Sequence, residues 1–324
     1  MDREYRIRRI AYGQEASGEG FEVRPCSPEG MRKLVSTRFI VLLTLILFVS
    51  GSKAARTGPI EPLMGPPAEA PAAGTVRLLT WNVAHGRAEA FHQALLPRDE
   101  VKRNLEKIAQ VLRHERPDLV ALQEADGPSA WSGGFDHVST LARATGLSSH
   151  FHGDHNPFGL SGYDLSAGTA LLSRFPMAET LSHPFAANWR DTKGFVVATV
   201  EVPGTDHALD VVSVHLDFLN PAARRAQILA LADALEGRDR PRVVLGDLNC
   251  EAESATEAFR LLEERLGVVP YEPALDQPTF PAASPSRRLD WILASPELEF
   301  VSYRPIEAYL SDHLGVVAEL RLAG

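Results

Sequence analysis

The sequence predicts an α/β fold in which β-sheets pack on each other and helices cover their outer faces. Two observations predict it. Short apolar segments rich in β-branched residues recur from residue 76 to residue 322, which is typical of buried strands. Only a few segments between them carry apolar residues at helical spacing, and the connections are long. Many strands and few helices favour packed sheets over a helical bundle.

The first half of the folded region alternates strands and helices. Residues 76–83 are apolar and β-branched and predict the first strand. Apolar side chains at helical spacing predict a helix over residues 99–114, which Pro117 ends. Residues 118–124 predict a second strand, and residues 135–147 predict a second helix.

Residues 150–164 are predicted as a loop because they contain several glycines. His150, His152 and His155 lie in this loop. A zinc site is one interpretation of histidines this close, but no cysteine joins them and their spacing is irregular. A polar loop that faces the substrate is the favoured interpretation.

The second half of the folded region is predicted to consist mainly of strands. Residues 221–235 form its predicted helix, with Ile228, Leu231 and Leu235 on one face. The predicted strands are residues 168–175, 195–202, 209–216, 243–248, 287–295 and 315–322.

The strand over residues 243–248 leads into a pair of polar residues. Asp247 and Asn249 lie two positions apart, so their side chains share one face of an extended chain. Gly246 lets the backbone come close to a neighbouring group. A carboxylate and an amide at this place suit a hard cation and a phosphate oxygen, although turn chemistry alone explains such a pair equally well.

Most of the predicted strands end in polar residues. Buried polar groups cost free energy unless they are paired. The acids among these residues have no lysine nearby in the sequence, so they favour a divalent cation. The residues are Asn82, Glu124, His215, Asp247 with Asn249, Asp290, and Asp312 with His313.

The segments that carry these residues resemble, in the same order, the motifs of the endonuclease/exonuclease/phosphatase superfamily. The resemblance covers roughly residues 75–322 and implies a hydrolase that acts on phosphoric ester bonds. It also implies a four-layer α/β sandwich, with two packed mixed β-sheets flanked by helices and the site at one end. The segments are Thr80-Trp81-Asn82-Val83, Leu122-Gln123-Glu124, Gly246-Asp247-Leu248-Asn249 and Ser311-Asp312-His313, together with residues 168–174, 213–217 and 289–292.

The resemblance further implies a role for each residue at the metal end of the site. Glu124 is expected to bind Mg²⁺ or Mn²⁺, with Asn82 alongside and Asp312 as a further ligand. Hard oxygen ligands favour Mg²⁺. Asp247 is expected to orient or deprotonate the attacking water.

The remaining residues are expected to contact the substrate. Asn249 and His215 would contact phosphate oxygens. Asp290 and His313 would form a carboxylate–imidazole pair, which fixes the tautomer of the histidine and favours its charged form. Whether Asp247 or His313 accepts the proton stays open.

Some residues depart from the pattern of the apurinic endonucleases or are ambiguous. Ala84 stands where those enzymes carry an acid, and His215 stands where they commonly have tyrosine, so the sequence favours the deoxyribonuclease and sphingomyelinase-like branches. His85 is either a feature of one branch or a turn residue. Arg224 and Gln227, on the helix after His215, either tie to the site or lie on the helix surface.

The N-terminal region is expected to direct the protein out of the cytoplasm or to a membrane. Residues 31–54 contain a basic start, the apolar run 39–49 and small residues, which are typical of a signal peptide or of an uncleaved membrane anchor. Met31 is a hypothetical true start. The predicted regions are residues 1–54, a flexible Pro/Ala/Gly linker over residues 55–74, and the catalytic domain over residues 75–324.

The charge limits the class of substrate. The formal net charge is −9, and residues 1–74 carry +2, so the remaining residues carry −11. Such a domain should not hold nucleic acid by a broad electrostatic footprint. A lipid headgroup or a small diester is therefore favoured over DNA or RNA, although few exposed aromatic clusters for inserting into a bilayer are evident.

Other functions compete with an exported or membrane-tethered phosphodiesterase. An exported nuclease is the main alternative. A non-catalytic binding module and a structural extracytoplasmic domain are disfavoured because every expected ligand is present. No obligate protein partner is evident.

Overall fold

The structure, a computed structural model, describes residues 68–69, 74–155, 158–160, 163–185, 193–203, 208–253, 255–272 and 276–322. They all belong to one compact unit, Pro59–Gly324. The predicted targeting segment, residues 31–54, lies outside the described residues, as does most of the predicted linker. Within the described part of the chain, none of the helices combines the length and the hydropathy that crossing a bilayer requires.

The first sheet is mixed and has six strands in the order β13-β14-β1-β2-β6-β3. Its central strand β1 is parallel to β2 and antiparallel to β14. The bounds are β1 (Thr75–Asn82), β2 (Leu119–Asp126), β3 (Ser149–Asp154), β6 (Ala167–Ser173), β13 (Leu298–Ile306) and β14 (Gly315–Leu322).

The second sheet is also mixed and six-stranded, in the order β11-β12-β10-β9-β8-β7. Here β9 and β10 are parallel, and β12 is antiparallel to β10. The bounds are β7 (Met177–Pro184), β8 (Gly194–Glu201), β9 (Ala208–His215), β10 (Arg242–Asp247), β11 (Val269–Pro270) and β12 (Asp290–Ala294); a separate two-stranded sheet pairs β4 (Phe158–Leu160) with β5 (Tyr163–Leu165).

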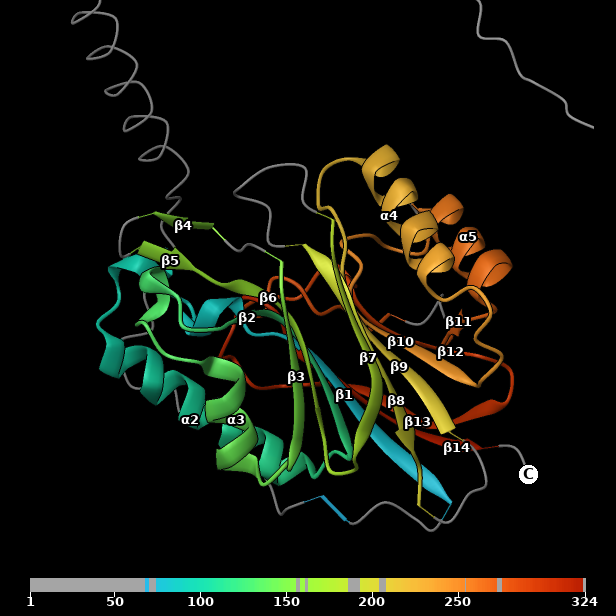
Figure 1. The fold of residues 1–324 in the computed structure, drawn as a ribbon, viewed down its shortest axis with the longest axis horizontal. Helices are drawn as coiled ribbons and strands as arrows, with labels where there is room; N and C mark the ends of the chain where they lie inside the picture. The colour runs from blue at the N-terminus through green and yellow to red at the C-terminus, as the bar shows by residue number, and fades with distance from the viewer. Residues whose placement is uncertain are drawn as a thin grey trace, which may run out of the picture. The chain divides into compact units, whose positions relative to one another are not determined.

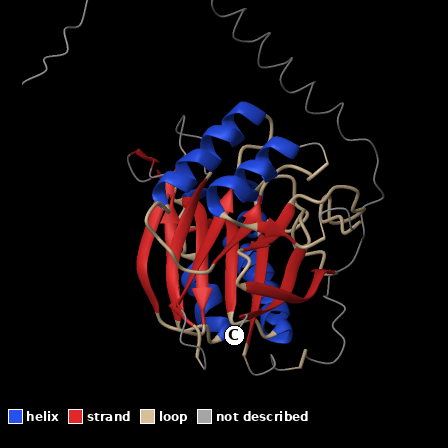
Figure 2. Cartoon of the chain, turned by 90° about the vertical axis from the view of Figure 1, so that its right-hand side faces the viewer, coloured by secondary structure: helices blue, strands red, loops and turns tan. Residues whose placement is uncertain are grey.

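Two pairs of helices form the outer layers (Figure 1). The helices α2 (Arg98–Glu115) and α3 (His137–Thr145) cover the first sheet, and α4 (Pro221–Ala234) and α5 (Thr256–Leu266) cover the second. Figure 2 shows one helix pair in front of the strands and the other pair behind them. Three short 3₁₀ helices, η1 (Ala84–Gly86), η2 (Gln93–Leu95) and η3 (Ala130–Ser132), lie in the connections. The predicted four-layer α/β sandwich is confirmed.

The strands are apolar on both faces because both faces are covered. In β1, Leu78 packs in the core between the two sheets, whereas the next residue, Leu79, packs against α2. In β9, Val211 faces the inter-sheet core and Val212 faces α4. Successive side chains of a strand point to opposite faces, so a strand in an inner layer becomes a continuous apolar run.

A buried polar link joins the two sheets near one end of the sandwich. The Nε2 atom of Gln123 on β2 donates hydrogen bonds to the Oγ1 atom of Thr80 on β1 and to the Oγ atom of Ser213 on β9, both at 3.2 Å. All three side chains are fully buried. Their pairing offsets the cost of burying them and fixes the two sheets relative to each other where the strands approach the site.

The prediction of a loop over residues 150–164 is wrong. This segment contains most of β3 and the hairpin β4–β5. Only Gly153 is buried in β3, which lies at an edge of its sheet, so β3 lacks the apolar signal that marks the inner strands. The predicted elements also lack β7, β13 and α5. The strands β7 and β13 are edge strands with many exposed residues, so they lack a clear apolar pattern.

Part of the predicted linker contacts the catalytic domain. The backbone nitrogen of Ala68 donates to the carbonyl oxygen of His114, 3.0 Å away, at the end of α2. The guanidinium of Arg77 donates to the carbonyl oxygen of Glu69 at 2.7 Å. The chain therefore enters the domain beside the carboxyl end of α2.

Candidate active site

Three of the predicted site residues lie in one row across the second sheet. Asp247 at the end of β10 is the register partner of His215 on β9 and of Asp290 on β12. All three are 2% exposed or less. Strand pairing, rather than loop conformation, therefore sets how these three side chains lie.

Gly246 allows this row to form. Its φ is +155°, and a Cβ atom at this position would lie 1.9 Å from the carbonyl oxygen of Val214 on β9. Only glycine fits so close an approach. The neighbouring group that Gly246 accommodates is thus the adjacent strand.

The first sheet contributes Asn82 and His313 to the same place. The Nδ2 atom of Asn82 donates to Oδ2 of Asp247 at 3.1 Å. The Oγ atom of Ser311 donates to the carbonyl oxygen of Asn82 at 2.7 Å, and the indole of Trp81 donates to the carbonyl oxygen of His313 at 3.0 Å. The two sheets therefore meet at Asp247.

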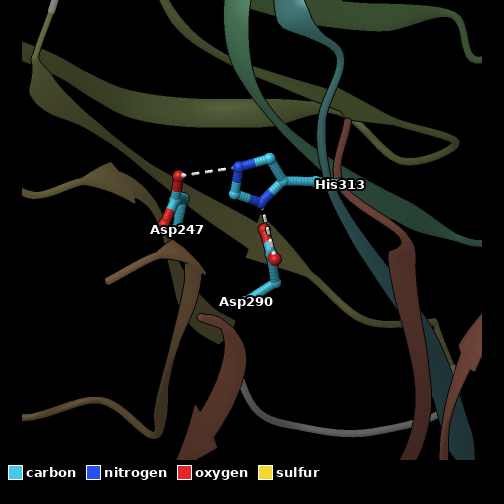
Figure 3. A group of neighbouring side chains, drawn as sticks. All are labelled: Asp247, Asp290 and His313. Atoms are coloured by element: carbon cyan, nitrogen blue, oxygen red, sulfur yellow. Dashed lines mark hydrogen bonds and ion pairs between the residues drawn. The ribbon is translucent and has the colours of Figure 1, made fainter. Parts of the chain in front are cut away.

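His313 lies between two carboxylates (Figure 3). Its Nδ1 atom lies 2.9 Å from Oδ2 of Asp290, and its Nε2 atom lies 3.8 Å from Oδ2 of Asp247. The hydroxyl of Thr279 donates to the same oxygen of Asp290 at 2.6 Å. Asp290 and Thr279 thus fix the orientation of the imidazole, and its Nε2 atom faces Asp247. We call Asp290, His313 and Asp247 the buried array.

The charges of the buried array shift its pKa values. Burial alone would lower the pKa of His313, but Asp290 and Asp247 raise it to about 10. Burial raises the pKa of Asp247 to about 7, against the opposing effect of His313. His313 is therefore an imidazolium at neutral pH, and Asp247 is a weaker acid than an ordinary aspartic acid.

His215 has the opposite character. Burial lowers its pKa well below the usual value, and the positive charges of Lys193 and His313 lower it further, so it is a neutral imidazole. Its Nε2 atom lies 3.4 Å from Oδ2 of Asp247. Its buried Nδ1 atom has no hydrogen-bond partner among the described residues. The site therefore contains a charged and a neutral imidazole on the same carboxylate.

Asn249 fixes the carboxylate of Asp247 through a backbone hydrogen bond. Its backbone nitrogen donates to Oδ1 of Asp247 at 2.9 Å, and its side-chain Nδ2 donates to the carbonyl oxygen of Leu216 at 3.0 Å. The predicted contact between Asn249 and a phosphate oxygen stays a prediction.

A second set of carboxylate and imidazole groups lies beside the first. The Nδ1 atom of His85 lies 2.7 Å from Oδ1 of Asp126, and its Nε2 atom lies 3.3 Å from Oε2 of Glu124. The indole of Trp131 donates to Oδ2 of Asp126 at 2.8 Å. Burial would lower the pKa of His85, but Asp126 and Glu124 raise it to about 9. We call Asp126, His85 and Glu124 the open array, since the Glu124 side chain is 23% exposed.

Three residues of the site, His85, Glu124 and Asn249, have left-handed backbone conformations that orient their side chains. His85 and Glu124 have φ values of +54° and +50°, and Asn249 has +52°. Glu124 is the extra residue of an irregularity in the pairing of β2 with β6. Left-handed residues other than glycine cost about 1–3 kcal/mol each and cluster at functional sites, and β-bulges re-aim side chains there.

Asp312 forms an ion pair with Arg87 at the more exposed side of the site. The Oδ1 atom of Asp312 also lies 3.3 Å from the hydroxyl oxygen of Ser311. Asp312 and Glu124 each lie against a cationic side chain, which shows that this side of the site attracts positive charge. Carboxylate oxygens of this kind are the donors that a hard divalent cation prefers.

A different trio also satisfies the spacing for a metal site. Among the described residues, one group of at least three His, Cys, Asp or Glu side chains has ligand atoms within 4.8 Å of one another, and it consists of Asp247, Asp290 and His313. Asp290 and His313 already bond to each other, however, and the raised pKa of His313 keeps that imidazole protonated. Glu124 and Asp312 are the more exposed carboxylates, with side chains 23% and 33% exposed, and they offer the oxygen donors that a hard cation prefers.

The residues after His215 brace the site without entering it. Gln227 accepts a hydrogen bond from the backbone nitrogen of Asp217 at 2.8 Å, and Arg224 donates to the carbonyl oxygen of Asp217 at 3.0 Å. Both side chains are buried, at 8% and 9% exposed. They tie α4 to the turn that follows β9 and are not surface residues.

The predicted zinc alternative finds no support in the described part of the chain. His152 bonds to the carbonyl oxygen of Ala125 at 3.0 Å, and His150 lies 3.2 Å from the hydroxyl of Ser139. No group of metal-ligand spacing among the described residues includes either histidine.

Asp126, Thr279 and Arg87 are site residues that are not among those predicted from the sequence. Asp126 follows Glu124 by two positions, the same spacing that draws attention to Asp247 and Asn249, so this signal is present in the sequence. Thr279 and Arg87 lie in irregular segments, where no periodicity marks them.

Comparisons with known proteins agree with this architecture. The sequence matches the model of the Endonuclease/Exonuclease/phosphatase family over residues 79–313. A comparison with curated proteins finds no match.

Similar folds occur in solved structures of this family and of related enzymes. An endonuclease/exonuclease/phosphatase from Beutenbergia cavernae is 24% identical, with a TM-score of 0.62 over 77% of this chain and 72% of that chain. A humanized D. rerio TDP2 is 18% identical, with a TM-score of 0.56 over 77% of this chain and all of the other, at 100%. The human nocturnin catalytic domain is 19% identical, with a TM-score of 0.55 over 77% of this chain and 94% of that chain. These likenesses show the fold, and the family match over most of the chain shows that this protein belongs to the endonuclease/exonuclease/phosphatase family.

Proposed function

We propose that this protein hydrolyses a phosphodiester by in-line attack of a water molecule that Asp247 activates. Family membership supports a hydrolase that acts on phosphoester bonds. The observation that carries the proposal is the buried array, in which Asp247 lies within reach of His313, His215 and Asn82. A carboxylate surrounded by donors at one point suits both the binding of a phosphoryl group and the positioning of a water.

Asp247 is the proton acceptor in this proposal. His313 is held by Asp290 through its Nδ1 atom, which stabilises the imidazolium, so His313 has no free site for another proton. Its Nε2–H group instead donates to an oxygen of the phosphoryl group and stabilises the charge that develops there. Asp247 has a raised pKa, which suits a general base near neutral pH.

His215 contacts the substrate in this proposal, whereas Asn249 and Asn82 hold Asp247 in place. The neutral His215 offers one N–H group to a phosphate oxygen without adding charge. Asn249 keeps the Asp247 carboxylate in place through its backbone nitrogen. Asn82 donates to Asp247 and links it to the metal end of the site.

The metal ligands in this proposal are Glu124 and Asp312, with Asn82 alongside. Mg²⁺ or Mn²⁺ suits their hard oxygen donors. When bound, the cation neutralises negative charge on the phosphoryl oxygens. Binding requires Arg87 to release Asp312, because the two side chains form an ion pair in this structure.

The preferred substrate is a lipid headgroup or a small diester. The charge of −11 on residues 75–324 disfavours tight binding to duplex nucleic acid, so an exported nuclease is the second candidate. The structure of the human nocturnin catalytic domain contains a bound sulfate anion, which supports an oxyanion site in this fold. Export or membrane tethering is proposed from the sequence of residues 31–54 alone.

One panel of substrates tests the function. The purified protein with Mg²⁺ is offered plasmid DNA, sphingomyelin, a phosphoinositide and bis-p-nitrophenyl phosphate, with and without EDTA. We expect turnover of a lipid or the small diester, loss of turnover in EDTA, and recovery with Mg²⁺ or Mn²⁺. Activity that survives full chelation would contradict the metal mechanism, cleavage of plasmid alone would make the protein a nuclease, and no turnover of any substrate would favour a binding module.

A further inference from the structure

Large apolar side chains are exposed at few places in the described residues, and most of them lie in segments that directly follow site residues in the chain. The exposed fractions are 78% for Phe91, 74% for Leu95, 60% for Phe218 and 76% for Leu219. The two others in the described residues, Val269 and Val301, are smaller and only 40% and 43% exposed. We call Phe91, Leu95, Phe218 and Leu219 the apolar rim.

The first part of the rim, Phe91 and Leu95, lies in a segment that is connected to the open array. Phe91 and Leu95 lie in the connection between η1 and α2, which starts directly after His85 and Gly86. Arg87 at the base of this connection pairs with Asp312. Farther along, η2 contacts η3, whose Trp131 donates to Asp126. Both ends of the connection are thus tied to site residues.

The second part of the rim is a rigid turn directly after His215. The Oδ1 atom of Asp217 accepts hydrogen bonds from the backbone nitrogens of Leu219 and Asn220 at 2.9 and 2.7 Å. The Nζ atom of Lys193 lies 5.1 Å from the centre of the Phe218 ring. Together with the brace from Arg224 and Gln227, these bonds hold Phe218 and Leu219 in exposed positions.

Fixed exposure of large apolar side chains beside a polar site needs an explanation. A soluble domain gains free energy by burying such groups, and concentrated apolar exposure marks contact surfaces. A small water-soluble diester needs no apolar surface outside the site. A lipid does, because its headgroup stays at the surface of an apolar phase.

We propose that the apolar rim contacts the surface of a lipid bilayer, so that the active site opens towards the headgroup phosphates of membrane lipids. This inference rests on the proposed function, whose substrate class it narrows to lipids in a membrane. The charge of −11 on residues 75–324 repels strongly anionic membranes, so a zwitterionic surface such as phosphatidylcholine fits best.

The amino-acid sequence before the described domain favours a lipid as the occupant of the rim. Residues 31–54, with the apolar run 39–49, have the composition of a signal peptide or a membrane anchor. An anchor of this kind would keep the protein at a lipid surface.

A fluorescence experiment on the full chain tests the contact without relying on activity. An environment-sensitive fluorophore is attached to a cysteine at position 91 or 218, in a Cys26→Ser background in which Cys250 is buried at 3% exposed. The matched control carries the label at position 301, in the middle of the edge strand β13. On adding phosphatidylcholine vesicles, we expect the emission of both rim labels to shift as in an apolar medium, while the label at position 301 stays aqueous. Rim labels that stay aqueous, or a label at 301 that shifts equally, overturn the proposal.

Turnover separates this inference from the proposed function. The variant Phe218→Ser/Leu219→Ser is compared with Val301→Ser on bis-p-nitrophenyl phosphate and on phospholipid in vesicles. We expect the ratio of vesicle to soluble turnover to fall by roughly tenfold or more in the rim variant only, because two large apolar side chains no longer leave water. An unchanged ratio overturns the rim. If no variant and no wild-type protein turns over either substrate, the proposed function fails, and the fluorescence labels still decide whether the rim enters the bilayer.

Discussion

The buried and open arrays use the same chemical unit in two environments. In each, an aspartate holds Nδ1 of a histidine, at 2.9 Å for His313 and 2.7 Å for His85, and the Nε2 atom faces a second carboxylate. The facing carboxylate differs. Asp247 is 1% exposed and lies in regular strand register. The Glu124 side chain is 23% exposed and lies where the register of β2 with β6 shifts. Burial makes Asp247 a weaker acid that suits proton transfer, whereas the more exposed Glu124 is accessible to a cation.

Breaking the buried array should produce the largest effect on turnover. We expect Asp247→Asn and His313→Ala each to lower kcat by at least ~10²-fold, since each removes a general base or a charge-stabilising donor. Steady-state kinetics on the substrate that the panel identifies measures the loss. Asp233→Asn on α4 is the matched control, because its side chain is 72% exposed and should leave kcat unchanged.

The fold of these variants decides how the loss is interpreted. Circular dichroism and thermal unfolding should show a native-like fold in Asp247→Asn, which preserves the shape of the side chain. Near-wild-type kcat in a folded Asp247→Asn protein would refute the role of Asp247.

The open array should make stability depend on pH. The folded-state pKa of His85 is about 9, above the ordinary 6.5, so its stabilising contribution is fully present below pH 6.5 and is lost as pH rises through 9. In metal-free protein we expect His85 to contribute a fall of up to about 3 kcal/mol in the free energy of unfolding over this window. Chemical unfolding at several pH values checks this.

The variant His85→Gln isolates this contribution from other titrating groups. The contribution of His313 is lost over an overlapping window, from pH 6.5 to about 10, so wild type alone does not separate the two histidines. The difference between wild type and His85→Gln should therefore shrink between pH 6.5 and 9. A difference that stays constant over that range would show that His85 carries no extra charge in the folded state.

Metal affinity should distinguish the two candidate groups of ligands. If Glu124 holds the cation, Asp126→Asn should raise the Kd for Mg²⁺ by about 10-fold, because the variant removes a negative charge close to the metal ligand. Isothermal titration calorimetry measures this without substrate. Asp290→Asn is the comparison: a larger effect of Asp290→Asn than of Asp126→Asn would move the metal to the buried array.

The sequence predicts most residues of the buried array but not all of the open array, and the difference has a physical cause. Regular strand register brings Asp247, His215 and Asp290 together, and apolar strands that end in polar residues reveal such a row. The open array depends on left-handed backbone at His85 and Glu124, which no periodic pattern encodes. His85 therefore stays ambiguous in the sequence, although Asp126 carries a readable signal.

The fold follows the same division. Inner strands such as β1 and β9 are apolar on both faces and are recognised easily. The edge strands β3, β7 and β13 are missed, because water covers part of them and their composition approaches that of loops. The prediction of packed sheets with helices on their outer faces depends on the inner strands, so it holds despite these omissions.

The smallest effect should come from Arg87, which competes with a cation for Asp312. The two side chains form an ion pair that is partly exposed, at 19% and 33%. Pairs of this kind contribute ~0.2–1 kcal/mol, so we expect Arg87→Met to lower the Kd for Mg²⁺ by a factor of about 5 or less. Calorimetric titration of the metal measures the change, with Arg225→Met as the control, since Arg225 pairs with Glu257 on the outer helices. An increase in Kd would instead show that Arg87 supports the metal site. Arg87 and Mg²⁺ would then not compete for Asp312.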